Sequence, residues 1–386
     1  MQVYFIRKLS KIASILKTKS SAKDKSEMRI LVVANSYIPT LQLSIIKPLD
    51  ELINKGICTV TIITEQQMKS KFGKNTRSEK SWAWIQKNYL NKDITHILFC
   101  RYSGPHFSKF IKHSKAKNIA NMYLIDDDIL NVPIELGEKK FKYHNHPLRL
   151  KAVNYLLNNC DLIYCSNINL YQRLRKLGID NDIYTTEIFC GGKILTKATL
   201  RPVTTIGYMG FDHTHDFQIA LPAIIKIMRK YPHIKFELFG KIPKPLQLDE
   251  FGNRVSVLPP IEQYDLFLHD LSLRNWDIGI CPLARTDFNL AKNINKWIEY
   301  SLSGSCVIAS KNMIYDYCCS DNCGTLVDDQ DWFEALNHII EHPDERYRQV
   351  SNAQDRLKHD FSIEHQRSQL LTAISQADKN QLNRAQ

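Results

Sequence analysis

Short apolar runs that alternate with segments of helical periodicity constrain the fold of this chain more than any other feature of its sequence. The alternation starts at Met28 and includes the runs MRILVVAN, CTVTIIT, THILFCR, NMYLIDDD and DLIYCSN. Runs that are apolar almost throughout are typical of parallel strands whose two faces are both covered by helices. Segments 41–56, 147–160 and 168–178 have helical spacing. The pattern therefore predicts stacked βαβ units in a doubly wound parallel sheet.

The alternation stops near the middle of the chain and then starts again. Glycines, small polar residues and a proline between positions 190 and 204 predict a linker. Beyond it, the runs TTIGYMG, IKFELFG, VSVLPP, WDIGICPL and CVIAS predict the strands of a second sheet. We therefore expect an α/β chain with two Rossmann-like, doubly wound domains, at 28–195 and 204–355, that face a cleft. We expect residues 356–386 to form a C-terminal helix, and one arrangement is that this helix packs back on the first domain.

The composition narrows the classes of partner. The chain has 386 residues, 44% hydrophobic and 24% charged, which is typical of globular domains. A formal net charge of +12 and an isoelectric point of about 9.1 suit nucleic acid, an anionic membrane surface or a phosphorylated substrate. No run approaches the roughly 20 apolar residues that span a bilayer. The ten cysteines lie mostly in apolar runs, and CCSDNC lacks paired zinc spacing, so we expect reduced thiols and a cytoplasmic location.

Residues 1–27 form a distinct basic segment. They carry seven lysines and arginines against two acidic residues, and Phe5, Leu9 and Ile12 fall near one helical face. One interpretation is an amphipathic helix that holds the protein peripherally on the anionic inner face of the cell membrane. The other is a solvated extension before the first strand. Both interpretations are open from the sequence.

The segment FNLAKNINKWIEYSLSGSCVIAS, residues 288–310, has the most specific polar pattern. It predicts one helix that ends at Gly304, with a buried face made of Ile294, Trp297, Ile298 and Leu302. The opposite, polar stripe consists of Lys292, Lys296, Glu299 and Ser303. Lysines near a helix start are unfavourable, because the helix dipole there favours anions by about 0.3–1 kcal/mol per charge. Either these lysines lie on a wet surface at little cost, or an external anion such as a diphosphate binds beside them.

Two further features of this half suit a nucleotide. Glu299 could accept hydrogen bonds from two vicinal hydroxyls, as on a ribose. Gly210 ends the predicted strand TTIGYMG, where glycine would let the backbone approach a phosphate. A polar loop that caps a helix explains the same glycine equally well.

In the first half, LIDDDILNVP groups Asp126, Asp127 and Asp128 at the end of a predicted strand. These carboxylates could bind the hydroxyls of an acceptor or, less readily, a metal ion. A solvated helix cap is the alternative. Arg101 ends THILFCR and would point toward the same cleft if that strand is parallel. Asp126 and Arg101 are therefore the candidate catalytic residues.

These motifs resemble the GT-B fold glycosyltransferases of family 4, the glycosyl transferases group 1. MRILVVANSYIPT resembles the opening of the acceptor domain, IGYMGFDHTHDFQIALPAIIKIMRKYPHIKFELFG the start of the donor domain, and WDIGICPLARTDFNLAKNINKWIEYSLSGSCVIAS the donor motif. The likeness covers roughly residues 28–375. It implies an enzyme that transfers a sugar from a nucleotide-diphosphate-sugar donor to a glycan or lipid-linked acceptor. It further implies retention of configuration and a place in cell-surface polysaccharide synthesis.

The resemblance also implies the residues of the donor site. These are Gly210, Lys292, Asn293, Ile294, Asn295 and Glu299, with Glu299 on the ribose and the backbone of Ile294 and Asn295 facing the diphosphate. No metal or other cofactor is implied, because fixed positive groups aid the leaving phosphate.

The chain departs from the family pattern at three places. Ala291 stands where the first of two glutamates is usual, GFDHTHD lacks the usual Arg and Lys, and ANSYIPT lacks a glycine-rich loop. Lys292 could supply the missing charge. The alternative function is an inactive, glycosyltransferase-like binding protein. A nucleic-acid-binding module is disfavoured, because no motif of that class is visible and the basic residues are dispersed.

Overall fold

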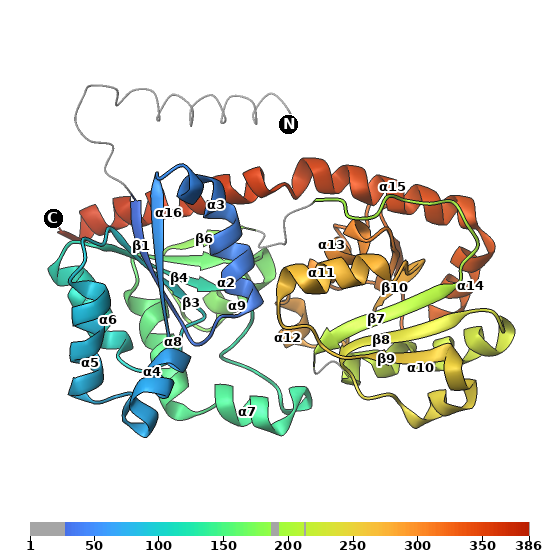
Figure 1. Cartoon of the computed structure of the whole chain (residues 1–386), viewed down its shortest axis with the longest axis horizontal. Helices are drawn as coiled ribbons and strands as arrows, with labels where there is room; N and C mark the ends of the chain where they lie inside the picture. The colour runs from blue at the N-terminus through green and yellow to red at the C-terminus, as the bar shows by residue number, and fades with distance from the viewer. Residues whose placement is uncertain (1–27, 187–192, 212–213, 386) are drawn as a thin grey trace.

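The computed structural model describes residues 28–186, 193–211 and 214–385, and these form two six-stranded parallel sheets with helices on both faces (Figure 1). The basic segment 1–27 lies outside the described residues, so its two interpretations stay predictions. Within the described part, no helix combines the length and the apolar character that crossing a bilayer requires.

The first sheet has the strand order β2-β1-β3-β4-β5-β6, and every neighbouring pair is parallel. Its strands are β1 (Met28–Ala34), β2 (Cys58–Thr64), β3 (His96–Cys100), β4 (Ala120–Ile125), β5 (Leu162–Cys165) and β6 (Ile183–Thr185). The chain winds outward in one direction through β2 and in the other through β3. The order therefore reverses between β1 and β3, which is where ligands bind in sheets of this kind.

The helices of the first domain follow its strands. They are α2 (Pro39–Leu41), a π-helix η1 (Gln42–Ile46), α3 (Lys47–Asn54), α4 (Glu65–Phe72), α5 (Glu79–Ile85), α6 (Phe107–Ala116), α7 (Glu138–His144), α8 (Pro147–Asn159) and α9 (Ile168–Lys176). Shorter helical turns are η2 (Gly73–Asn75), η3 (Gln86–Leu90) and η4 (Ile134–Leu136).

The second sheet repeats this arrangement with the order β12-β11-β10-β7-β8-β9. Its strands are β7 (Thr205–Phe211), β8 (Lys235–Lys241), β9 (Val255–Leu258), β10 (Ile278–Cys281), β11 (Cys306–Ser310) and β12 (Thr325–Val327). Its helical elements are α10 (Thr214–Lys230), η5 (Leu246–Arg254), α11 (Tyr264–Leu273), α12 (Asp287–Leu290), α13 (Asn295–Leu302), α14 (Trp332–Glu341) and α15 (Pro343–Asp360). Here the order reverses between β7 and β10.

The α/β prediction with two doubly wound domains is confirmed, but one expected helix is wrong. The segment 288–303 is two short helices, α12 and α13, separated at residues 291–294. Lys292 therefore lies in the connection before α13 and not on the first turn of a single helix. The predicted apolar face is confirmed, since Ile294, Trp297, Ile298 and Leu302 are all buried. Gly304 follows α13 with φ +78°, as a helix C-terminus of this kind requires.

The last helix, α16 (Ile363–Ala385), crosses from the second domain to the first. Figure 1 shows α15 along the second domain and α16 along the first. Leu370, Ala373, Ile374 and Ala377 of α16 belong to the buried cluster on one face of the first sheet. Gln366 donates a hydrogen bond to the Leu43 carbonyl at 3.0 Å. The C-terminal helix thus ties the two domains together.

A second set of contacts joins the domains at the 291–294 connection. Asn167 donates to the carbonyls of Ala291 and Lys292 at 3.0 and 3.1 Å. Ala291 is buried and packs into the hydrophobic cluster of the first domain. Arg173 contacts Asp128 of its own domain and Asp287 of the other. The break between α12 and α13 is therefore held from the first domain.

Candidate functional site

A cavity of about 240 Å³ lies between the two domains, where the carboxyl ends of both sheets meet. It is lined by Pro39, Thr40, Leu43, Arg101, Asp126, Asp127, Leu136, Lys140, Leu283, Phe288, Lys292, Asn293, Asn295, Lys296 and Tyr315. The first domain contributes the segments after β1, β3 and β4, and the second those after β10 and β11. In the first domain the cavity lies at the point where the strand order reverses, whereas in the second it lies to one side of the reversal between β7 and β10.

Arg101 follows β3 in a strained backbone conformation. Its φ is +48°, in the left-handed region that residues other than glycine rarely adopt. The side chain of Asn35, just after β1, holds this turn by donating to the Arg101 carbonyl at 3.1 Å and accepting from the Ser103 amide at 3.1 Å. Such strain persists only where the surroundings fix it, and it is commonest at functional sites.

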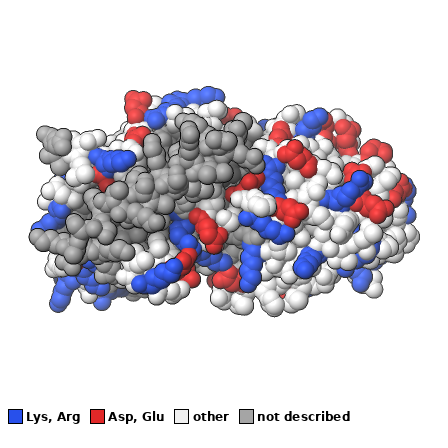
Figure 2. Space-filling model, turned by 90° about the horizontal axis from the view of Figure 1, so that it is seen from above, with Lys and Arg blue, Asp and Glu red and all other residues white. Residues whose placement is uncertain are grey.

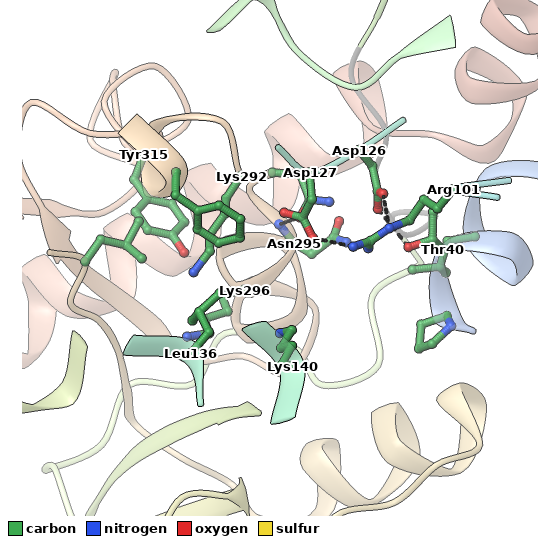
Figure 3. A pocket seen from close by; sticks show the side chains of 15 residues that line it. Thr40, Arg101, Asp126, Asp127, Leu136, Lys140, Lys292, Asn295, Lys296 and Tyr315 are labelled. Atoms are coloured by element: carbon green, nitrogen blue, oxygen red, sulfur yellow. Dashed lines mark hydrogen bonds and ion pairs between the residues drawn. The ribbon is translucent and has the colours of Figure 1, made fainter. Parts of the chain in front are cut away.

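The guanidinium of Arg101 binds two of the three consecutive aspartates after β4. It lies 3.2 Å from Asp126 and 3.0 Å from Asp127, and Thr40 donates to Asp126 at 2.7 Å (Figure 3). Burial raises the pKa of Asp126, and the Arg101 charge opposes that rise. The structure therefore brings the two candidate catalytic residues into direct contact on the first-domain wall.

Asp128 points elsewhere. It accepts hydrogen bonds from Asn131 and from Arg173, the arginine that also contacts the second domain. The three aspartates therefore do not converge on one point. In the part of the chain that the structure describes, no group of three or more His, Cys, Asp or Glu side chains is placed to hold a metal ion.

The opposite wall of the cavity carries two lysines of the second domain (Figure 3). Lys292 lies 3.8 Å from Asp216, and burial lowers its pKa to about 8. The ammonium of Lys296 is buried, has no hydrogen-bond partner among the described residues and lies 4.7 Å from the centre of the Tyr208 ring. Burial also lowers its pKa. An unpartnered buried ammonium is costly, so a site that keeps one is suited to an anion.

The start of α13 adds backbone donors to these charges. Ile294, its N-cap residue, makes no side-chain cap, but the Asn295 amide donates to the Asn293 side-chain oxygen at 3.4 Å, so the amides left for a ligand are those of the residues that follow. Asn293 and Asn295 line the cavity, and the side-chain oxygen of Asn295 is buried without a partner in the described chain. Ile294 itself points into the core of the second domain. Gly210 lies one residue before the end of β7, beside Gly240, and does not line the cavity.

The later residues of the predicted polar stripe are buried in the structure. Glu299 is 8% exposed and Ser303 only 2%. Glu299 accepts a hydrogen bond from Tyr264 at 2.8 Å and does not line the cavity. Burial raises its pKa to about 7, against the opposing effects of Tyr264 and Lys296. The ribose contact of Glu299 stays a prediction.

Replacing Glu299 with glutamine should stabilise the protein at alkaline pH. Between pH 4.5 and about 7 the folded state binds more protons than the unfolded state, so the free energy of unfolding falls as the pH rises. Glutamine removes this titration and still accepts the Tyr264 hydrogen bond. At about 1.4 kcal/mol per pKa unit, we expect a gain of up to about 3 kcal/mol at pH 8 and almost none at pH 4. Urea denaturation at both pH values measures it, and an equal effect at the two would contradict the assignment.

Several residues of the cavity were not singled out by the sequence as binding groups. Lys140 and Leu136 come from a stretch without periodic pattern, and Tyr315 follows β11 in a loop. Thr40, in α2, donates to Asp126, which is 86 positions later, and Asn35, just after β1, donates to the Arg101 carbonyl, which is 66 positions later. The lysine stripe was a signal for Lys296, which the predicted donor residues nevertheless omitted.

Comparisons with known proteins place the fold. No protein-family model matches the sequence, and no curated protein matches it either. The structure resembles Anabaena HepE in complex with UDP-glucose, with a TM-score of 0.61, 15% identity and coverage of 90% of this chain and 100% of that one. It also resembles sucrose-phosphate synthase from Thermosynechococcus elongatus, with a TM-score of 0.62, 15% identity and coverage of 93% and 100%.

A third similar structure is α,α-trehalose 6-phosphate synthase from Burkholderia multivorans, with a TM-score of 0.56 and 10% identity. The match covers 93% of this chain and 99% of that one. These relatives share two Rossmann-like domains that face each other, and the two parallel sheets of this chain correspond to theirs. The chain has the GT-B fold.

Proposed function

We propose that this protein is a glycosyltransferase that uses a nucleotide-diphosphate-sugar donor. The observation that carries the proposal is the convergence of Lys292, the buried Lys296 and the start of α13 on one wall of the interdomain cavity. The diphosphate binds there, since helix amides and ammonium groups both favour phosphate oxygens. The GT-B fold, which HepE in its UDP-glucose complex shares, supports this assignment.

The Arg101–Asp126 pair faces the diphosphate wall and orients the acceptor. Asp126 accepts the hydrogen bond of the attacking hydroxyl, and Arg101 fixes the carboxylate in place. The hydroxyl oxygen bonds to the anomeric carbon as the bond from that carbon to the phosphate oxygen breaks, and the proton is released with the diphosphate. The lysine wall stabilises the charge that develops on the leaving phosphate. In this proposal no metal or other cofactor takes part.

The resemblance of the donor motif to family 4 supports the finer parts of the proposal. These are retention of configuration and a glycan or lipid-linked acceptor in cell-surface polysaccharide synthesis. A nucleic-acid partner is disfavoured by the charge distribution on the face in Figure 2, where basic and acidic side chains alternate over the described residues of the second domain. Nucleic-acid binding favours a continuous basic stripe.

A panel of nucleotides and nucleotide sugars tests the function. The protein should be stabilised against heating by at least one nucleoside diphosphate, and should release that nucleotide from its sugar when acceptor glycans are supplied. Binding without turnover on any acceptor would favour the inactive, donor-binding alternative suggested by Ala291. Salt-sensitive binding of nucleic acid without nucleotide binding would reject the glycosyltransferase.

Replacing Lys292 with alanine should weaken binding of the nucleoside diphosphate by about 10- to 100-fold and leave binding of the nucleoside within about twofold. The ammonium contacts phosphate in this proposal and nothing in the base or ribose. Because the pKa of Lys292 is about 8 in the free protein, affinity should fall as the pH rises above 8, and binding near that pH should take up a proton. Calorimetry in buffers of different ionisation enthalpy measures both effects. Equal losses for diphosphate and nucleoside would mean that Lys292 does not contact phosphate.

A further inference from the structure

A segment of the first domain lines the cavity and contacts the second domain. This capping segment, residues 129–146, contains η4 and α7, which Figure 1 shows below the boundary between the domains. Val132 and Leu136 form a small buried cluster with Phe288 of α12. The hydrophobic contact joins the capping segment to α12, the helix just before the connection that carries Lys292.

Lys140 projects from α7 into the cavity (Figure 3). Among the described residues it makes no ion pair or hydrogen bond, whereas Lys142 on the same helix pairs with Glu138. The charge of Lys140 acts on groups of both domains. It contributes to lowering the pKa of Lys292 in the second domain. The pKa of His144 in the first domain is lowered by burial, by Arg101 and then by Lys140. The two domains thus direct like charges toward one another.

Three ammonium groups, from Lys140, Lys292 and Lys296, therefore surround one small cavity. With Arg101, four cations line the cavity against the two carboxylates of Asp126 and Asp127, which leaves a formal charge of +2, and Asp216 lies 3.8 Å from Lys292. A ligand with a single negative charge would leave most of this repulsion in place. A sugar diphosphate carries two negative charges, and a released nucleoside diphosphate about three at pH 7, because the terminal phosphate has a second pKa near 6. The charge of the cavity matches a diphosphate better than a monoanion.

We infer that Lys140 is a third phosphate-binding cation, supplied by the first domain, so that the donor diphosphate bridges the two domains through its two phosphates. This inference rests on the proposed function. It follows that Lys140 interacts more strongly with the diphosphate that leaves than with the sugar diphosphate that enters. Interactions that strengthen as charge develops raise the rate of transfer. Lys140 therefore contributes to the rate as well as to donor affinity.

Calorimetric titration of the full chain with UDP, GDP, ADP and CDP, and with the corresponding monophosphates, tests the inference. Lys140→Gln should weaken the affinity for the nucleoside diphosphate that binds wild type by about 10-fold. The affinity for the corresponding monophosphate should fall by less than about twofold. Lys140→Arg should stay within about threefold of wild type. Lys139→Gln is the matched control, because it removes the same charge from the same helix at an exposed position off the cavity wall. Its affinities should equal those of wild type.

The outcomes separate this inference from the function on which it rests. Equal effects of Lys140→Gln and Lys139→Gln, or equal losses for mono- and diphosphates, would overturn the role of Lys140 alone. So would a Lys140→Gln variant that keeps its diphosphate affinity and raises only the KM for an acceptor, since Lys140 would then contact the acceptor. If wild type binds no nucleotide at all, the proposed function fails and the inference fails with it. Thermal melting of each variant confirms that it is folded.

Discussion

Replacing Arg101 with glutamine should lower the free energy of unfolding by about 3 kcal/mol or more and abolish sugar transfer. The side chain of Asp126 is only 5% exposed, and Arg101 is the cation that compensates it. Removing one partner of such a buried pair leaves the other charge without compensation, which typically costs about 3–5 kcal/mol. The loss should shrink at acidic pH, because the pKa of Asp126 would rise further and protonation would remove the unpaired charge.

The reciprocal variant provides the control. Asp126→Asn should cost only about 1 kcal/mol, because Arg101 keeps Asp127 at 3.0 Å and the new amide oxygen still accepts from Thr40. The double variant should be close to Asp126→Asn and well above Arg101→Gln in stability. Urea denaturation of the three proteins measures these differences. If Arg101→Gln is no less stable than Asp126→Asn, the arginine does not serve to compensate the buried carboxylate.

The part of the site that lies at strand ends could be predicted from the sequence. Two of these residues, Arg101 and Asp126, directly follow buried apolar runs, and Lys292 lies in the segment after another such run. The carboxyl ends of parallel strands meet at one edge of each sheet. Two alternating halves place those edges face to face. The regular periodicity of the sequence is therefore enough to predict that these residues lie near one cavity, although it does not predict their contacts.

The part of the site that depends on tertiary contacts could not be predicted. A helical wheel places Lys296 and Glu299 on one polar stripe, but it does not show that the core of the second domain wraps around that stripe. At the break, residues 291–294, the Asn167 side chain of the other domain donates to two carbonyls of the connection. The left-handed turn at Arg101 likewise depends on Asn35, 66 residues earlier. None of these contacts leaves a periodic signal.

The alanine at position 291 has a structural explanation in this protein. Its methyl group is 1% exposed and packs in the core of the first domain, and its carbonyl accepts from Asn167. A glutamate at this place would bury a carboxylate at the domain contact, which is costly without a cationic partner. Position 291 thus joins the domains, and the second domain's two cavity lysines, Lys292 and Lys296, follow it.

Replacing Lys296 with methionine should stabilise the free protein while it removes most of the donor affinity. The Lys296 ammonium is buried without a hydrogen-bond partner in the described chain, and burial lowers its pKa. Apolar replacements of buried charges often stabilise proteins by about 1–4 kcal/mol, and methionine has a similar length and flexibility. The same change removes the cation that compensates a buried phosphate. The binding free energy should become less favourable by about 2–5 kcal/mol, which lowers the affinity by about 30-fold or more.

The gain in stability should depend on pH in a way that identifies its cause. Between the lowered pKa of Lys296 and the usual 10.5, the unfolded state binds more protons than the folded state, so wild-type stability rises with pH. The advantage of Lys296→Met should therefore be largest near neutral pH and shrink toward pH 10. Lys235→Met, at an exposed position of β8, is the control and should change neither stability nor nucleotide affinity appreciably. If Lys296→Met instead destabilises the free protein and leaves nucleoside diphosphate binding intact, the buried ammonium serves the core of the second domain and the phosphate must bind elsewhere.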